Sequence, residues 1–218
     1  MKVDSKYSLI LASNSPRRKE LLGWMEIPFK VMGSNIEEHS NETNPKDFAI
    51  DIAVQKGEAI WSELDFVSTP HPFIVSSDTI VVLGDRIYGK PSSKEEAREM
   101  LLSLSGKEHK VITSVYLKAK SIKTGGEISC KFAIETDVTF SPITEDILGP
   151  YLGGNDSMDK AGAYGIQGQG LLFVESLKGS YSNVVGFPLV EFVDEMRELL
   201  CEGVLEEKLL WRNKFAMD

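Results

Sequence analysis

The stretch that follows the first apolar run limits the fold of this chain most strongly. Residues 9–12 (LILA) form a short, continuous apolar segment of the kind found in buried strands, and the polar run SNSPRR follows at positions 13–18. Proline has a fixed φ and no N–H, so Pro16 suits the first position of a helix, with Ser15 as its N-cap. We therefore predict a strand, a tight turn and a helix in succession, which is the start of an α/β fold.

Two arginines, Arg17 and Arg18, fall in the first turn of this predicted helix. The helix dipole favours anions at that end, so cationic side chains fit there poorly unless a negative group binds. Free backbone N–H groups, hydroxyls and arginines together make a good phosphate or carboxylate site. The alternative is that both arginines lie in solvent, which is the commoner case for an arbitrary pair. The rest of the chain has to decide between the two.

The acidic balance of the chain limits its partners. Its 33 acidic and 24 basic residues give a net charge of -9, which argues against broad binding to DNA or RNA but not against a small anionic ligand. Cys130 and Cys201 predict neither a disulfide framework nor a zinc site. No signal peptide is visible, and no apolar run approaches the ~20 residues of a membrane span. We expect a cytoplasmic protein that does not bind membranes, with one domain over residues 1–218 in which 201–218 form a C-terminal extension.

Apolar periodicity, capping residues and turn residues predict alternating strands and helices along the rest of the chain. The predicted strands are 29–32, 73–83 (continuous or broken by a bend), a hairpin of 111–119 and 128–140, and 171–177. The predicted helices are 44–64, 92–105, 144–149 and 188–200, and residues 179–183 are expected to form a loop.

Two charged residues stand in apolar surroundings. Asp78 lies in the middle of the predicted strand 73–83, and a carboxylate is rarely buried without a partner because desolvating its charge is costly. Lys56 falls on the apolar stripe of helix 44–64, where it either extends to solvent at the edge of the core or points into a cleft. Asp78 is therefore a stronger functional candidate than any acid on a solvent-exposed face.

A glycine-rich run at 159–170 (DKAGAYGIQGQG) would let a ligand approach the backbone closely. It matches neither a Walker A loop nor a dinucleotide fingerprint. An ion pair of Asp159 with Lys160 is as well supported as ligand contact, and we expect Tyr164 and Tyr181 to pack rather than to stack on a base. The histidines lack metal-ligand spacing and are expected to be structural or exposed: His39, His71 and His109.

The candidate polar groups together suit phosphate chemistry. Cations would hold phosphates, carboxylates would hold a divalent metal, and a carboxylate or the metal would activate water. The residue types thus predict a metal-dependent phosphoester or phosphoanhydride hydrolase. They do not by themselves identify a substrate.

From about residue 9 to residue 200 the chain resembles the Maf family of nucleotide pyrophosphatases. The resemblance rests on ordered motifs: SNSPRRKELL at 13–22, IEE at 36–38, AVQK at 53–56, SDTIV at 77–81, GKP at 89–91, LSG at 104–106, KAGAYGIQG at 160–168, GSY at 179–181 and VGFPL at 185–189. It implies an elongated, two-lobed α/β fold with a mixed twisted sheet, flanking helices and a central cleft, like the inosine triphosphate pyrophosphatases.

The resemblance also implies an activity and a set of roles. Members cleave a nucleoside triphosphate between the α- and β-phosphates with a divalent metal (Mg, Mn or Co), and a homodimer is the family expectation. Asp78 would accept the proton of the attacking water, and Glu38 would help it hold the metal. The triphosphate would be bound by Ser13, Arg18, Lys56 and Lys90. Without the resemblance, Glu38 would be interpreted as a solvated acid and Lys90 as a loop residue.

The family has one branch that acts on dTTP and UTP and another that acts on 7-methyl-GTP. At three positions this chain resembles the first branch: Arg17, Thr79 and Gln167. A glutamine amide can pair with the O4/N3–H edge of uracil or thymine. We therefore expect hydrolysis of dTTP and UTP, or a house-cleaning activity on modified nucleotides. The alternative is a nucleotide-binding regulator of septum formation with little turnover. The chain departs from the family pattern mildly, with Gly57 in place of the common alanine and Phe187 in place of a leucine.

Overall fold

The computed structural model describes residues 6–201 and 210–216. Its strands are β1 (Ser8–Leu11), β2 (Phe29–Val31), β3 (Pro72–Leu83), β4 (Arg86–Tyr88), β5 (Glu108–Lys120), β6 (Glu127–Phe140) and β7 (Val174–Lys178). Its α-helices are α1 (Pro16–Gly23), α2 (Pro45–Glu63), α3 (Lys94–Leu104), α4 (Glu145–Gly153), α5 (Tyr181–Val185) and α6 (Leu189–Cys201). Short 3₁₀ helices are η1 (Ala161–Ala163), η2 (Gly168–Phe173) and η3 (Trp211–Lys214).

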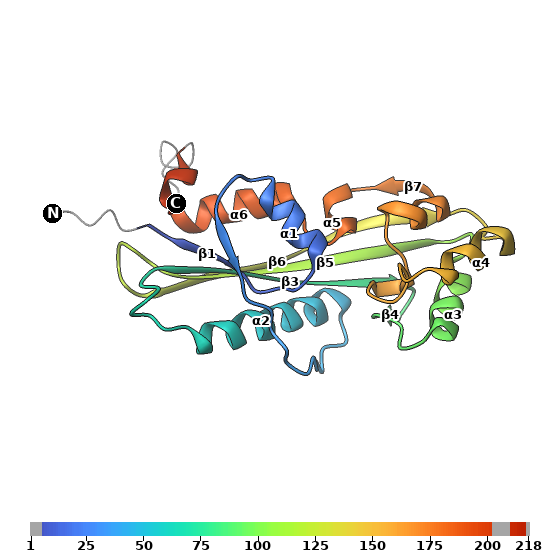
Figure 1. The fold of residues 1–218 in the computed structure, drawn as a ribbon, viewed down its shortest axis with the longest axis horizontal. Helices are drawn as coiled ribbons and strands as arrows, with labels where there is room; N and C mark the ends of the chain where they lie inside the picture. The colour runs from blue at the N-terminus through green and yellow to red at the C-terminus, as the bar shows by residue number, and fades with distance from the viewer. Residues whose placement is uncertain (1–5, 202–209, 217–218) are drawn as a thin grey trace.

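Within the described ranges, seven strands form one mixed, twisted sheet in the order β2-β1-β3-β5-β6-β7, and β4 pairs with β3. The strands β2, β1 and β3 run parallel, whereas β3, β5, β6 and β7 are joined in antiparallel pairs. The long strands β3, β5 and β6 run through the middle of an elongated molecule, as Figure 1 shows. The predicted strand 73–83 is therefore continuous, and the predicted hairpin is confirmed with longer arms.

Helices cover both faces of the sheet. Helix α2 lies on one face, and α1, α5 and α6 lie on the other, while α3 and α4 gather at the end of the molecule away from β1 (Figure 1). Side chains alternate between the two faces along a strand, so Leu9 and Leu11 enter the main core whereas Ile10 packs under α2 with Ile60 and Trp61. Burial on both faces explains why the first strand is apolar at every position.

The helix starts follow the predicted capping. The Ser15 hydroxyl accepts a hydrogen bond from the N–H of Arg18, with Pro16 at the first helical position. Asn44 accepts from the N–H of Lys46 in the same way, and Pro45 begins α2. These contacts are local in sequence, which is why they could be predicted without the fold.

The predicted strand 171–177 begins later in the structure than expected. Residues 168–173 form the 3₁₀ helix η2, and the strand β7 begins only at Val174. Gly168 has a φ of 75°, and a Cβ at Gly170 would lie 2.3 Å from the carbonyl oxygen of Gly165. This close backbone approach folds the chain back on itself and leaves no room for an extended strand.

The expected loop at 179–183 is also a correction. It contains the start of the short helix α5, which Ser180 caps by accepting from the N–H of Asn183, and which ends at Gly186 with a φ of 117°. Tyr164 is buried, as predicted, but Tyr181 is 50% exposed, so its expected packing role is wrong.

The C-terminal extension is described only at 201 and 210–216. There the chain returns to the first strand, because the N–H of Tyr7 donates to the carbonyl oxygen of Lys214 and the N–H of Ala216 donates to that of Tyr7. Trp211 and Phe215 belong to the main core. No helix in the described ranges combines the length and the apolar character that a membrane crossing requires.

Candidate active site

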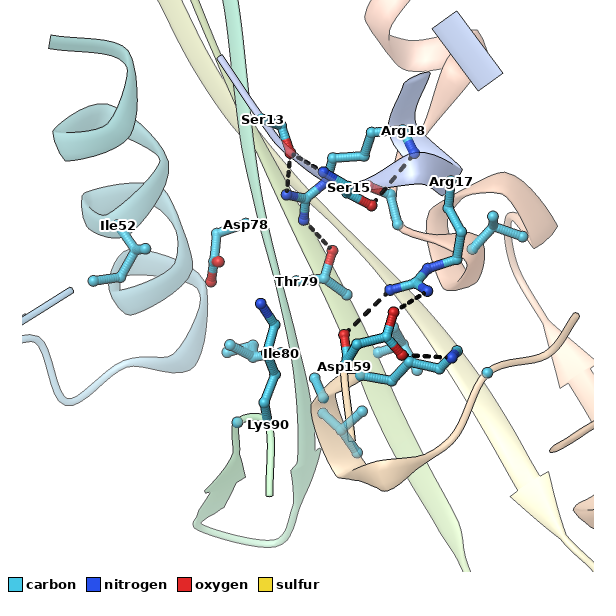
Figure 2. A pocket seen from close by; sticks show the side chains of 18 of the residues that line it. Ser13, Ser15, Arg17, Arg18, Ile52, Asp78, Thr79, Ile80, Lys90 and Asp159 are labelled. Carbon is cyan, nitrogen blue, oxygen red and sulfur yellow. Dashed lines mark hydrogen bonds and ion pairs between the residues drawn. The ribbon is translucent and has the colours of Figure 1, made fainter. Parts of the chain in front are cut away.

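A cleft of about 870 Å³ lies where the turn between β1 and α1, the middle of α2, the middle of β3 and the glycine-rich segment meet. All nine residues that the sequence singled out as site candidates line it: Ser13, Arg17, Arg18, Glu38, Lys56, Asp78, Thr79, Lys90 and Gln167. Part of the cleft is shown in Figure 2. The structure therefore brings together residues that are up to 154 positions apart (from 13 to 167).

Three acceptors from three segments hold the guanidinium of Arg18. Its Nε donates to the carbonyl oxygen of Gly186 at 3.0 Å, its Nη1 to Ser13 Oγ at 3.2 Å, and its Nη2 to Thr79 Oγ1 at 3.0 Å. A guanidinium has five N–H groups, so one on each terminal nitrogen is not used by these contacts. That pair is the fork with which arginine binds phosphate oxygens.

The surroundings of Arg18 favour an anionic ligand. Burial away from water lowers the pKa of its guanidinium, an effect that Asp78 offsets and that the neighbouring charge of Arg17 reinforces. Desolvation penalises the charged form, and a bound anion would compensate for it. The cationic first turn predicted from sequence therefore points into a cleft rather than into solvent.

Lys56 lies between two carboxylates. Its Nζ donates to Asp78 Oδ1 at 2.8 Å and lies 2.9 Å from Glu38 Oε1. The side chains of Lys56 and Asp78 are each only 12% exposed, whereas that of Glu38 is 47% exposed. The lysine on the apolar stripe of α2 thus points into the cleft, and the acid inside β3 is its partner.

Arg17 crosses the cleft to the glycine-rich segment. Its Nη1 donates to Asp159 Oδ2 at 2.9 Å and its Nη2 to the Asp159 carbonyl oxygen at 3.3 Å. Lys160 Nζ lies 2.6 Å from Asp159 Oδ1, so the predicted ion pair of these residues is confirmed. Both residues also line the cleft, and their contact with a ligand stays a prediction. Desolvation raises the pKa of Asp159, but hydrogen bonds from Lys160 and Arg17 outweigh it and hold that pKa below its usual range.

The other predicted residues complete the lining. In Figure 2 the side chain of Lys90 extends toward Asp78, and among the described residues it has no ion-pair partner. Thr79, on β3, accepts a hydrogen bond from Arg18. Gln167 is half-buried in the glycine-rich segment. Lys90 is therefore available to a ligand in the cleft.

The two carboxylates that share Lys56 offer oxygen ligands to a divalent cation. In the described ranges no cluster of three or more histidine, cysteine, aspartate or glutamate residues could hold a metal ion. Magnesium is commonly bound by one or two carboxylates together with substrate phosphates. Glu38 and Asp78 therefore fit a cation whose coordination is completed by a phosphate ligand.

Sequence reasoning missed the buried hydroxyl of Thr113 on β5, which lies 3.0 Å from that of Thr79. It also missed Asp159 as the partner of Arg17. Neither contact has a local sequence signal, because one depends on the pairing register of β3 with β5 and the other spans 142 positions. The strand register, once known, would have identified Thr113.

Comparison with known proteins identifies the family of this chain. The family described as Maf-like protein matches residues 8–199. A protein of Bacillus cereus (strain B4264) named dTTP/UTP pyrophosphatase is 41% identical over 191 residues, which cover 87% of this chain and 94% of that protein. A protein of Geobacillus sp. (strain WCH70) with the same name is 41% identical over 192 residues, 88% of this chain and 97% of that protein. With this match over nearly its whole length, the chain belongs to the Maf family.

Proposed function

We propose that this protein is a nucleoside triphosphate pyrophosphatase that hydrolyses dTTP and UTP to the monophosphate and pyrophosphate. The observation that carries the proposal is the convergence, in one cleft, of a nearly buried acid, Asp78, with the cations of Arg18, Lys56 and Lys90. The names of the relatives, dTTP/UTP pyrophosphatase, support the same substrates. A cleft lined by several cations, with the carboxylate of Asp78 among them, suits hydrolysis of a phosphoanhydride.

In the proposed reaction Ser13, Arg18, Lys56 and Lys90 bind the triphosphate. Asp78 takes a proton from a water molecule, whose oxygen forms a bond to the α-phosphorus. The bond from that phosphorus to the α–β bridging oxygen breaks, and pyrophosphate leaves. A divalent cation (Mg, Mn or Co) held by Glu38 and Asp78 would supply positive charge against the phosphate oxygens when bound.

Base selection is proposed for Arg17, Thr79 and Gln167, which line the same cleft. Asp159 limits the freedom of Arg17 through two hydrogen bonds, so its guanidinium presents a defined edge to a ligand. The half-buried amide of Gln167 can donate and accept at once, as the O4/N3–H edge of a pyrimidine requires.

The test is a panel of nucleoside triphosphates assayed with Mg²⁺, Mn²⁺ or Co²⁺, with the products identified. We expect monophosphate and pyrophosphate, the largest kcat/KM on dTTP and UTP, and a loss of pyrophosphate release in Asp78→Ala while the protein stays folded. Release of orthophosphate, or normal turnover by Asp78→Ala, would refute the proposal. Tight nucleotide binding without turnover would instead favour the regulatory alternative.

Gln167→Ala separates base selection from chemistry. We expect it to lower kcat/KM for UTP and dTTP more than for purine triphosphates. An unchanged ratio between the two classes would remove Gln167 from base selection.

The cytoplasmic location, the homodimer and the single domain over 1–218 stay predictions. Sedimentation of the full chain would decide the oligomeric state.

A further inference from the structure

A chain of hydrogen bonds leads from Arg18 away from the cleft into the core. Arg18 Nη2 donates to Thr79 Oγ1 at 3.0 Å, and Thr79 Oγ1 lies 3.0 Å from Thr113 Oγ1. Thr113 Oγ1 in turn donates to the carbonyl oxygen of Asn183 at 2.8 Å. The two threonines lie directly opposite each other in the antiparallel pairing of β3 with β5.

The two ends of this chain determine the direction of every bond in it. A carbonyl oxygen can only accept and a guanidinium can only donate, whereas each hydroxyl has one proton to give. Because Thr113 gives its proton to Asn183, it must accept the proton of Thr79. Thr79 has then given its only proton, so its oxygen can only accept from Arg18.

The inner end of the chain is firmly anchored. Asn183 is fully buried, and its Nδ2 donates to the carbonyl oxygen of Val111 and to Thr136 Oγ1, each at 3.0 Å. Thr113 is also fully buried and does not line the cleft. It therefore cannot touch a ligand directly. Its influence on the cleft passes through Thr79 or through the carbonyl oxygen of Asn183, which also accepts from the N–H of Gly186.

We propose that Thr113 is a positioning residue, which holds the Thr79 hydroxyl as an acceptor and so orients the guanidinium of Arg18 toward a phosphate. This rests on the proposed function, in which Arg18 binds the triphosphate. Without the Thr113 hydroxyl, the proton of Thr79 has no acceptor in the core and turns toward Arg18. Two donors then face each other, and the guanidinium loses one of its three anchors.

The decisive experiment is a double-mutant cycle with Thr113→Val and Thr79→Val, measured as kcat/KM on UTP. Valine keeps the shape of threonine and removes only the hydroxyl. We expect Thr113→Val alone to lower kcat/KM about tenfold, mainly through KM, because the charged guanidinium of Arg18 then loses one of its hydrogen bonds. In the Thr79→Val background, where no hydroxyl remains to be oriented, Thr113→Val should change kcat/KM less than about twofold. Equal losses in the two backgrounds, or wild-type activity in Thr113→Val, would overturn the proposal.

Two further variants distinguish positioning from general packing. Thr113→Ser keeps the hydroxyl and should restore most of the activity. Thr136→Val, the matched control, removes a second buried hydroxyl that holds Asn183 but does not contact Thr79, and its kcat/KM should stay within about twofold of wild type. A tenfold loss in Thr136→Val would assign the effect to the anchoring of α5 and overturn the role of Thr113. If Thr113→Val does not fold, as judged by circular dichroism, Thr113→Ala takes its place in the cycle.

Binding of inorganic tripolyphosphate, measured by calorimetry, keeps this proposal separate from the proposed function. If the wild-type protein releases no pyrophosphate from any nucleotide, the proposed function fails. The positioning role still predicts about tenfold weaker tripolyphosphate binding in Thr113→Val and no such change in the Thr79→Val background. Unchanged binding in Thr113→Val would refute the positioning role alone.

Discussion

Replacing Lys56 with methionine should destabilise the protein far more than replacing its partner Asp78 with asparagine. Among the described residues, the only donor to the Asp78 carboxyl group is Lys56, at 2.8 Å. Lys56, by contrast, has a second partner in Glu38 at 2.9 Å. Lys56→Met therefore leaves a nearly buried carboxylate unpaired, whereas Asp78→Asn leaves the ammonium paired.

The expected magnitudes follow from this asymmetry. Removing one partner of a fully buried ion pair costs about 3–5 kcal/mol. Asp78 faces the cleft and can be reached by water, so we expect a loss of about 2 kcal/mol in the free energy of unfolding for Lys56→Met. Asp78→Asn should lose less than about 1 kcal/mol, because its amide oxygen can still accept from the lysine. The double variant should be about 1–2 kcal/mol more stable than Lys56→Met alone, since it removes the unpaired charge.

Urea unfolding followed by circular dichroism at neutral pH measures these differences, provided that the free energy of unfolding falls with urea concentration at the same slope in all variants. The matched control is Arg98→Met, which breaks the exposed pair with Glu145 and should leave stability unchanged within error. A double variant no more stable than Lys56→Met, or a Lys56→Met variant as stable as wild type, would refute the reasoning. Each variant that removes Lys56 or Asp78 should also lose pyrophosphatase activity. Asp78→Asn should therefore lose activity with little loss of stability, which separates the two effects.

Two other predictions concern the core around the site. Gly57→Ala should destabilise the protein by about 1 kcal/mol, because a Cβ there would lie 2.6 Å from a ring carbon of Tyr116 and overpacking outweighs the gain of about 1 kcal/mol in helix propensity. Gly23→Ala, where a Cβ meets nothing within 4 Å, should be neutral or slightly stabilising in the same urea assay, and a more stable Gly57→Ala would contradict the clash. Burial lowers the pKa of His109 to about 4 from an ordinary value near 6.5, and its Nε2 lies 2.7 Å from the hydroxyl of Tyr164. Between these two pKa values the unfolded chain binds the extra proton, so stability falls with falling pH, by about 2 kcal/mol from pH 7 to pH 5 for this group. Between pH 7 and pH 5 the free energy of unfolding should fall less in His109→Gln than in the wild-type protein. Equal falls in the two proteins would exclude His109 as the source.

Features that depend on neighbours in the chain could be predicted from the sequence alone. The Ser15 and Asn44 caps are local hydrogen bonds from N–H groups two or three residues ahead. The apolar runs rich in β-branched residues likewise predicted most strands of the sheet. The motifs also indicated which residue types would line a cleft, because their chemistry is a property of the side chains themselves. The prediction that a strand begins at Leu171 was wrong for the opposite reason. Residues 168–173 form a 3₁₀ helix because of the close approach of Gly170 to Gly165, which composition does not reveal.

Only the tertiary structure decided which of these groups meet. Lys56 pairs with Asp78 because α2 packs on β3, and Arg17 reaches Asp159 across the cleft from 142 positions away. Thr113 lies opposite Thr79 through the register of two long strands, and a shift of one residue would turn its hydroxyl to the other face of the sheet. The sequence by itself thus determined the kinds of groups in the site and the local elements that present them. Packing and strand register, which are long-range properties, determined their partners and the directions of their hydrogen bonds.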